Sequence, residues 1–158
     1  SYEQSMLGRN IGIECSGIVS KCGKEVKKYK VGDHVLARHG GCIANRIRCN
    51  QLAAVKMPDN FSFEQGSALL SVYMTSYYSL IHLARLRKRH TVLIHSAMGG
   101  VGQAAIAIAK MQGARVYATA GSESKRQSLL EMGCVDAFDS HSSSWYFDLM
   151  NATKGKGV

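Results

Sequence analysis

The chain has 158 residues, of which 46% are hydrophobic and one is a proline, and its formal net charge is +9. This composition excludes a disordered or collagen-like chain, and the length allows a hydrophobic core without disulfide bonds. No apolar run approaches the roughly 18 residues of a membrane span. The opening SYEQSMLGRN lacks the basic start and apolar block of a secretory signal. We therefore expect a cytoplasmic globular protein with no membrane partner.

The cysteines, five in number, occur without a Cys-x-x-Cys pair. A disulfide framework or a zinc ribbon requires an even count and closer spacing. We therefore expect free thiols in a reducing compartment.

The positive charge gathers in Lys21–Lys30 and Arg85–His90. Such clusters can contact phosphates, but neither contains interleaved aromatic residues, zinc ligands or a helix-turn-helix pattern. A nucleic-acid partner is therefore not expected, whereas an acidic protein partner would suit the same basic surface.

The residues before the single proline predict a small, mostly antiparallel β unit. Ile11–Val19 is typical of one strand kinked at its glycines, and Val31–Leu36 runs from a turn into a second strand. Ile43–Arg48 alternates apolar and polar residues, which predicts a third, half-buried strand.

The periodicity becomes helical after the proline. Ser62 and Gln65 fit a capping box that opens a helix, and apolar residues continue beyond it at helical spacing. From Thr91 the chain has the pattern of a strand (TVLIHSA), a glycine turn (MGGVG), a helix that ends at Gly113, and a second strand (ARVYATA). This order of elements is that of a βαβ unit.

The last third of the chain continues the alternation. A second helix is expected over Ser124–Met132, opened by a Ser-x-x-Gln box at Ser124 and Gln127. Ala137-Phe138 predicts a third strand and Ser142–Thr153 a third helix. The fold class is therefore expected to be α/β.

The glycine turn matches the dinucleotide fingerprint. Gly100, Gly102 and Ala105 fit G-x-G-x-x-A between a buried strand and a helix rich in alanine and isoleucine. Glycines allow the sharp turn and the close approach of a pyrophosphate, which the N–H groups and dipole at the helix start attract. We therefore predict Gly99, Gly100, Val101 and Gly102 as cofactor-binding residues; the alternative is a glycine connection without a ligand.

The end of the second βαβ strand predicts which dinucleotide binds. An NAD site places Asp or Glu there, about 20 residues past the fingerprint, to hold the ribose hydroxyls. Thr119–Ser122 contains no acid, and Lys125 and Arg126 follow at a helix start. The Ser122 hydroxyl and two cations suit a 2′-phosphate, which favours NADPH over NADH. The alternative is that Lys125 and Arg126 are ordinary exposed helix residues.

Several stretches together carry a resemblance to one protein family: GIECSGIV (12–19), VGDHV (31–35), SVYMTSYYSL (71–80), TVLIHSAMGGVGQAA (91–105), GSESKR (121–126) and TKGKGV (153–158). Through them the chain resembles the enoyl reductase domain of type I polyketide synthases and animal-type fatty acid synthases. These domains belong to the medium-chain dehydrogenase/reductase superfamily. The stretches span almost the whole chain in the family's order.

The resemblance implies NADPH-dependent reduction of a trans-2-enoyl thioester, with hydride going to the β-carbon and a proton to the α-carbon. The substrate would be held on the phosphopantetheine arm of an acyl carrier domain. Neighbouring synthase domains would be partners, and a homodimer would form through the parent synthase. No metal site is expected, because Ile13 stands where zinc alcohol dehydrogenases of the superfamily have a zinc-binding histidine.

The resemblance also implies further site residues. Thr75 stands where a hydroxyl could hold the nicotinamide carboxamide, and Tyr73 where a catalytic hydroxyl could face the substrate. The alternative places both on the apolar face of a core helix. Ser140 and His141 match the family's Ser-Arg pair near the adenosine phosphate, where histidine makes the contact pH-dependent. The proton donors proposed for the family fall beyond Val158.

The domain organisation implied by the resemblance has three parts. We expect residues 1–60 to be part of a β-rich GroES-like substrate domain, 61–90 to be connecting helices, and 91–158 to be the N-terminal part of a Rossmann NADPH-binding domain. The chain is thus expected to be truncated at both ends. Two other functions stay open: a stand-alone zinc-independent NADPH:quinone-type reductase, or a non-catalytic remnant that acts as a structural or binding module.

Overall fold

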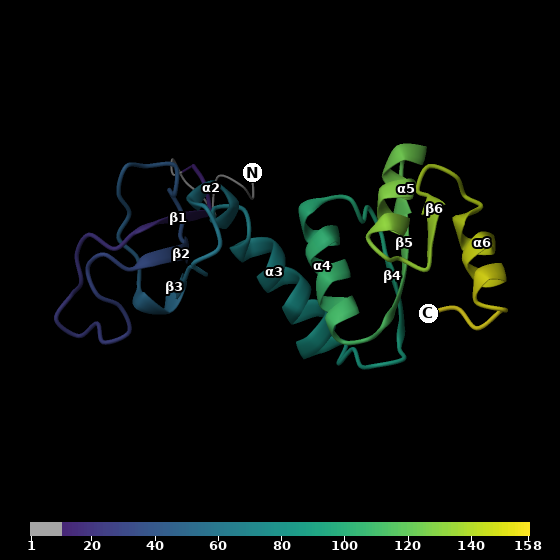
Figure 1. Ribbon diagram of the computed structural model, residues 1–158, viewed down its shortest axis with the longest axis horizontal. Coiled ribbons are helices and arrows are strands. Elements are labelled where there is room, and N and C mark those ends of the chain that lie inside the picture. The colour runs from purple at the N-terminus through teal and green to yellow at the C-terminus, as the bar shows by residue number, and fades with distance from the viewer. Residues whose placement is uncertain (1–10) are drawn as a thin grey trace, which may run out of the picture. The chain divides into compact units, whose positions relative to one another are not determined.

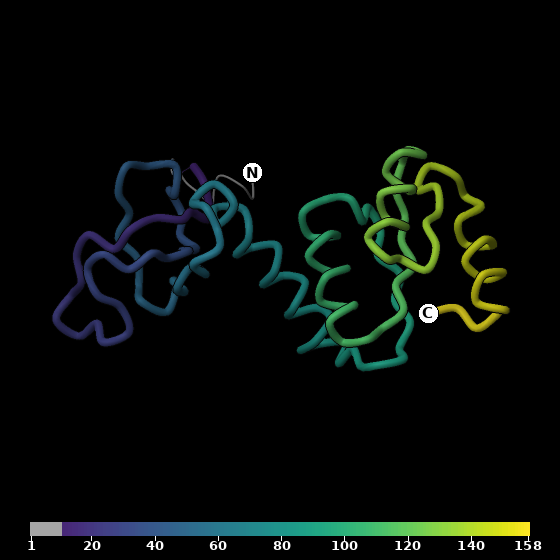
Figure 2. Tube along the Cα trace, in the orientation of Figure 1, coloured from purple at the N-terminus to yellow at the C-terminus, as the bar shows by residue number. Residues whose placement is uncertain are grey.

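The computed structural model describes residues 11–158 and divides into two compact units, one ending at Ser71 and the other comprising Val72–Val158 (Figure 1). The opening SYEQSMLGRN, on which the expectation about a secretory signal rests, lies outside the described residues. Within residues 11–158 no helix is both long and apolar enough to cross a bilayer. Figure 2 follows the path of the chain within each unit.

The first unit is built on an antiparallel sheet of three short strands, in the order β1 (Glu14–Ile18), β2 (His34–Arg38) and β3 (Ala54–Lys56). Its core is small and contains Tyr29 and Ala37, with half-buried Val35 and Ile47 packed around them. The predicted β-rich character of this part of the chain is confirmed.

The third predicted strand is wrong. Residues 43–48 form no strand, and the Ile43 side chain is 76% exposed. The strand that pairs with β2 is instead β3, which follows a short 3-10 turn, η1 (Gln51–Ala53), capped by the Asn50 side chain. A strand of three residues is too short to show an alternating pattern, whereas the alternation in 43–48 belongs to an irregular segment.

The helical part begins as predicted with α2 (Phe63–Gly66), whose capping box is formed by Ser62 and Gln65. This helix lies close to the sheet, because a Cβ added at Gly66 would come within 2.8 Å of the Leu36 side chain. After a short break, α3 (Leu70–Tyr77) continues into a π-helical segment, η2 (Tyr78–Leu83).

The second unit has a parallel sheet in the order β4 (Thr91–Ile94), β5 (Arg115–Ala120) and β6 (Asp136–Asp139). The connections are helical: α4 (Gly100–Met111) joins β4 to β5, α5 (Glu123–Glu131) joins β5 to β6, and α6 (Trp145–Ala152) follows β6. Beyond the ends of α4 and α5, Gly113 and Gly133 adopt left-handed φ values of 72° and 88°. The βαβ prediction and the α/β class are confirmed.

Both faces of the parallel sheet are covered, as Figure 1 shows for α4 and α6. Val116 and Ala118 of β5 pack with Ile106 of α4 and Leu129 of α5, whereas Tyr117 packs with α6. This division follows from the period of two in a strand, which points successive side chains to opposite faces. The carboxyl ends of β4, β5 and β6 therefore meet at one edge, which both helix layers flank.

Candidate functional site

The glycine turn after β4 leaves a helix start without a side-chain cap. Gly99 is the N-cap of α4, has extended backbone angles, and supplies no capping hydrogen bond. The first N–H groups of α4 are therefore available to an external acceptor, and the helix dipole favours an anion there. Gly102 allows the helix to lie close on the turn, because a Cβ at this position would be 2.5 Å from both Cα and O of Ala97.

Thr119 on β5 accepts two hydrogen bonds from the residues that precede this turn. Its carbonyl accepts the N–H of Ala97 at 3.0 Å, and its hydroxyl oxygen accepts the N–H of Ser96 at 3.2 Å. Thr119 is fully buried, and Ser96 has a left-handed φ of 49°. No sequence pattern predicts this role, because a strand pattern does not show that a buried threonine faces the neighbouring turn.

Helix α3 contacts the turn from another side. Ser76, which is buried, donates a hydrogen bond of 3.0 Å from its hydroxyl to the Val101 carbonyl. Val72 lies against Gly100, where an added Cβ would be 3.2 Å from its Cγ1. The side chains of the predicted residues Tyr73 and Thr75 are both exposed.

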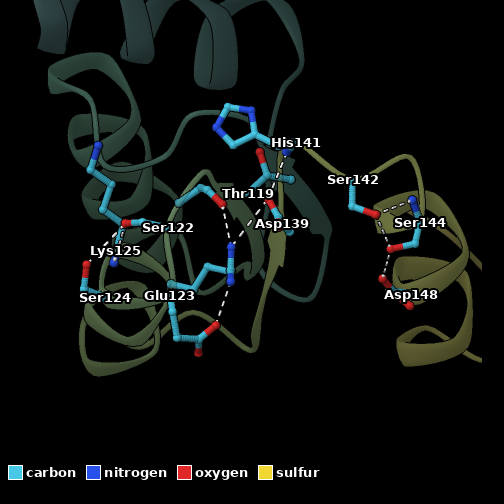
Figure 3. A network of polar contacts seen from close by, with 12 residues as sticks. Thr119, Ser122, Glu123, Ser124, Lys125, Asp139, His141, Ser142, Ser144 and Asp148 are labelled. Atoms are coloured by element: carbon cyan, nitrogen blue, oxygen red, sulfur yellow. Dashed lines mark hydrogen bonds and ion pairs between the residues drawn. The ribbon is translucent and has the colours of Figure 1, made fainter.

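The end of β5 leads directly into α5. Ser122 is the N-cap, and its hydroxyl oxygen accepts the Lys125 N–H at 3.4 Å (Figure 3). The expected cap at Ser124 is wrong, because Ser122 has the extended backbone of a cap whereas Ser124 already lies inside the helix. The Lys125 side chain is exposed.

Arg126, in contrast, is held by the protein. Its guanidinium donates to the Ala120 carbonyl at 3.2 Å, pairs with Glu123 at 2.6 Å and lies 3.5 Å from Asp139. Its side chain is only 17% exposed. These contacts link the end of β5 to α5 and β6, and they leave Lys125 as the exposed cation of the predicted pair.

Ser140 and His141 follow β6 at the same edge. The Ser140 N–H donates to the Ala120 carbonyl at 3.2 Å, and the His141 N–H donates to Asp139 Oδ1 at 2.9 Å. The His141 ring lies directly against Gly121, where an added Cβ would overlap its Nε2 atom. The structure thus brings Ser140 and His141 beside the β5 end that leads to Ser122; Figure 3 shows the labelled side chains around this edge.

The first unit contains none of the predicted cofactor residues. The Ile13 side chain is 42% exposed, and Glu14 beside it accepts the Ser71 N–H at 2.8 Å, a contact between distant segments that no sequence pattern predicts. Among the described residues no group of three or more His, Cys, Asp or Glu side chains is arranged to hold a metal ion.

All five cysteines are free thiols. Burial, followed by a hydrogen bond and charge interaction with Cys42, raises the pKa of Cys15 to about 12. Burial also raises the pKa of Cys49 and of Cys134. A nucleophilic cysteine needs a lowered pKa, so the surroundings of these three thiols do not activate them as nucleophiles.

Two family models match most of the chain. Residues 2–79 match the alcohol dehydrogenase GroES-like domain, and residues 100–158 match the zinc-binding dehydrogenase family.

Curated relatives include very long proteins. The chain is 43% identical to the highly reducing polyketide synthase pspA of Penicillium soppii, in an alignment covering 99% of this chain and 6% of that protein. It is 40% identical to the mycocerosic acid synthase-like polyketide synthase of Mycobacterium tuberculosis, covering 98% of this chain and 8% of that protein. The chain thus spans only a small part of the length of these relatives.

Solved structures with a similar fold include enoyl and quinone reductases. The CurK enoyl reductase is 33% identical with a TM-score of 0.92, and the match covers 99% of this chain and 49% of that one. The quinone oxidoreductase of Escherichia coli, complexed with NADPH, is 33% identical with a TM-score of 0.86, covering 94% of this chain and 46% of that one.

Proposed function

Because the chain belongs to the medium-chain dehydrogenase/reductase superfamily, we propose that its second unit binds NADPH for the reduction of a trans-2-enoyl thioester. The observation that carries the proposal is the uncapped start of α4, closed against the sheet at Gly102. It fits a dinucleotide, because a pyrophosphate requires free N–H groups and a turn without side chains.

The predicted residues of the glycine turn and of α3 have different parts in this proposal. The N–H groups of Gly100, Val101 and Gly102 hold the pyrophosphate, and Ser76 fixes the turn through the Val101 carbonyl. The Thr75 hydroxyl orients the nicotinamide carboxamide. The exposed Tyr73 hydroxyl faces the substrate and positions the thioester carbonyl. The bound cofactor supplies the hydride that the reduction requires.

The preference for NADPH rests on the charges around Ser122. Glu123 is the first acid after β5, and its carboxylate is bound to Arg126 rather than free for ribose hydroxyls. Lys125 supplies the positive charge for the 2′-phosphate, the Ser122 hydroxyl supplies a hydrogen bond, and Ser140 and His141 close the site from β6. Arg126 contributes by neutralising Glu123 and Asp139, which would otherwise repel the phosphate.

The substrate is proposed to arrive on the phosphopantetheine arm of an acyl carrier domain. The support is the length of the relatives, which are polyketide synthases of which this chain spans less than a tenth. Neighbouring domains of such a synthase are therefore the proposed partners, and the basic surface of the chain suits an acidic carrier domain.

A quinone-type reductase is the second candidate. It is supported by the likeness to the NADPH-complexed quinone oxidoreductase of Escherichia coli. Both candidates share the cofactor site, so the discrimination depends on the substrate alone.

The deciding experiment follows NADPH oxidation with crotonyl-pantetheine and with a benzoquinone as alternative acceptors, in the full polypeptide that contains this chain. We expect turnover of the thioester, with loss of activity in Thr75→Val. Turnover of the quinone alone would favour the second candidate. If NADPH neither binds nor is oxidised, the chain is a non-catalytic remnant.

A further inference from the structure

We propose that His95 is an additional cofactor-binding residue, which donates a hydrogen bond from Nε2 to a pyrophosphate oxygen, and that Thr119 positions it by fixing its tautomer. This inference rests on the proposed function, since it requires a dinucleotide at the glycine turn. The sequence patterns assign no role to His95.

The position of His95 follows from the strand that precedes it. Ile94 packs in the core beneath α4, whereas Leu93 packs on the opposite face, with Tyr117 and Phe138. Because side chains alternate along the chain, His95 continues on the face of Leu93, where the Trp145 ring meets it edge-on with centroids 4.9 Å apart. His95 is nevertheless exposed, and it lies at the carboxyl edge of the sheet, just before the glycine turn.

The tautomer follows from counting the hydrogen bonds of Thr119. Its hydroxyl oxygen already accepts the Ser96 N–H at 3.2 Å, and it lies 3.2 Å from Nδ1 of His95. Thr119 is fully buried, so its hydroxyl hydrogen needs an acceptor within the protein. Among the described residues Nδ1 of His95 is the acceptor within reach. Nδ1 therefore accepts, and the proton of the neutral ring is on Nε2.

The same threonine also maintains the backbone on which His95 is presented. Ser96 keeps a left-handed φ of 49°, a strained conformation for a non-glycine residue that concentrates at ligand sites. Hydrogen bonds from Ser96 and Ala97 to Thr119 hold this segment in place. The arrangement fixes both the ring and the turn that follows it.

The ligand atom is identified by position and chemistry. Nε2 carries a donor hydrogen, and no partner for it occurs among residues 11–158. The groups assigned to the 2′-phosphate follow β5 and β6, whereas His95 follows β4 and begins the turn assigned to the pyrophosphate. Pyrophosphate oxygens are strong acceptors, and a hydrogen bond to a charged acceptor is stronger than a neutral one.

The test compares ligands that contain and lack the pyrophosphate. We expect His95→Phe to lower the affinity for 2′-phospho-ADP-ribose and for NADPH about tenfold, which corresponds to the loss of one charge-assisted hydrogen bond. The affinity for adenosine 2′-monophosphate should stay unchanged. His95→Gln, which keeps a donor at similar reach, should restore most of the affinity. Thr119→Val should lower the affinity for the ligands that contain the pyrophosphate. Thr119→Ser should leave this affinity unchanged, because serine keeps the hydroxyl. Calorimetric titration of each variant measures these affinities.

His82→Phe is the matched control, because His82 is exposed and stacks on Tyr78 at 5.0 Å, a contact that phenylalanine preserves. Equal binding of all three ligands by wild type and His95→Phe would overturn the inference while leaving the proposed function intact. Equal weakening of all three ligands would also overturn it, since that pattern indicates a structural role. If wild type binds no pyrophosphate ligand, the proposed function itself fails.

Discussion

The guanidinium of Arg126 on α5 lies 3.5 Å from the carboxylate of Asp139 at the end of β6. This pair joins a helix to the neighbouring strand, and the same guanidinium also binds the Ala120 carbonyl. Arg126→Met removes these contacts, so we expect the free energy of unfolding to fall by about 1–2 kcal/mol. Affinity for NADPH should fall more than affinity for NADH, because the carboxylates of Glu123 and Asp139, no longer neutralised, repel the 2′-phosphate. Urea denaturation and cofactor titration measure the two effects; an unchanged free energy of unfolding would contradict the structural role, and equal losses for both cofactors would contradict the neutralising role.

The adjacent lysine should affect cofactor binding without affecting stability. Lys125 is exposed and its side chain takes no part in the contacts that hold Arg126. Lys125→Met should leave unfolding unchanged within about 0.5 kcal/mol. It should lower the affinity for NADPH about tenfold and leave the affinity for NADH unchanged, because only NADPH carries the 2′-phosphate. Equal changes for the two cofactors would show that Lys125 does not contact this phosphate.

The close approach of α4 to the turn makes Gly102 sensitive to any side chain. In Gly102→Ala the new Cβ would meet the Ala97 backbone at 2.5 Å, and a backbone cannot move aside as a flexible side chain can. We expect a loss of about 1–3 kcal/mol of unfolding free energy, together with weaker cofactor binding. Gly40→Ala is the control, since a Cβ there meets no atom within 4 Å. Similar melting temperatures for both variants would contradict the tight packing.

The raised pKa of Cys15 predicts a loss of stability in alkali. Burial raises this pKa from 9.0 to about 12, so between these values the unfolded chain loses a proton that the folded protein retains. The contribution of the Cys15 thiol to the free energy of unfolding is fully present below the pKa of the unfolded chain and is lost as the pH rises toward the pKa of the folded protein. Between pH about 8 and about 10.5, urea denaturation should therefore show a larger fall in the free energy of unfolding for wild type than for Cys15→Ala. An identical change of unfolding free energy with pH in the two proteins would argue against a raised pKa of Cys15.

Local patterns predicted the parts of the fold in which a few adjacent residues decide the structure. The capping box at Ser62 and the stop at Gly113 depend only on nearby backbone, and both are confirmed. The βαβ order was predictable because a glycine turn between a buried strand and a helix has few alternatives. The domain boundaries expected near residues 60 and 90 stay predictions.

The errors and omissions concern pairings between segments distant in sequence. Nothing local distinguishes Ile43–Arg48, which forms no strand, from Ala54–Lys56, which pairs with β2. The binding of Arg126 to Asp139 likewise arises only after β6 pairs beside β5. A basic residue at a helix start has the same sequence pattern whether it faces a phosphate or a carboxylate of its own protein, so Arg126 and Lys125 could not be separated.

The packing of His141 on Gly121 gives a prediction in which stability and binding separate. A Cβ at Gly121 would overlap Nε2 of His141, which is the end of an exposed side chain and can swing away. Gly121→Ala should therefore change the unfolding free energy by less than about 0.5 kcal/mol, unlike Gly102→Ala. It should lower the affinity for NADPH several-fold, because the displaced His141 ring no longer closes the site beside Ser122. In a His141→Ala background the same Gly121→Ala change should have no further effect on affinity, since the two positions act through one contact. Titration of the two single variants and the double variant completes the cycle, and additive losses would show that His141 and Gly121 act independently.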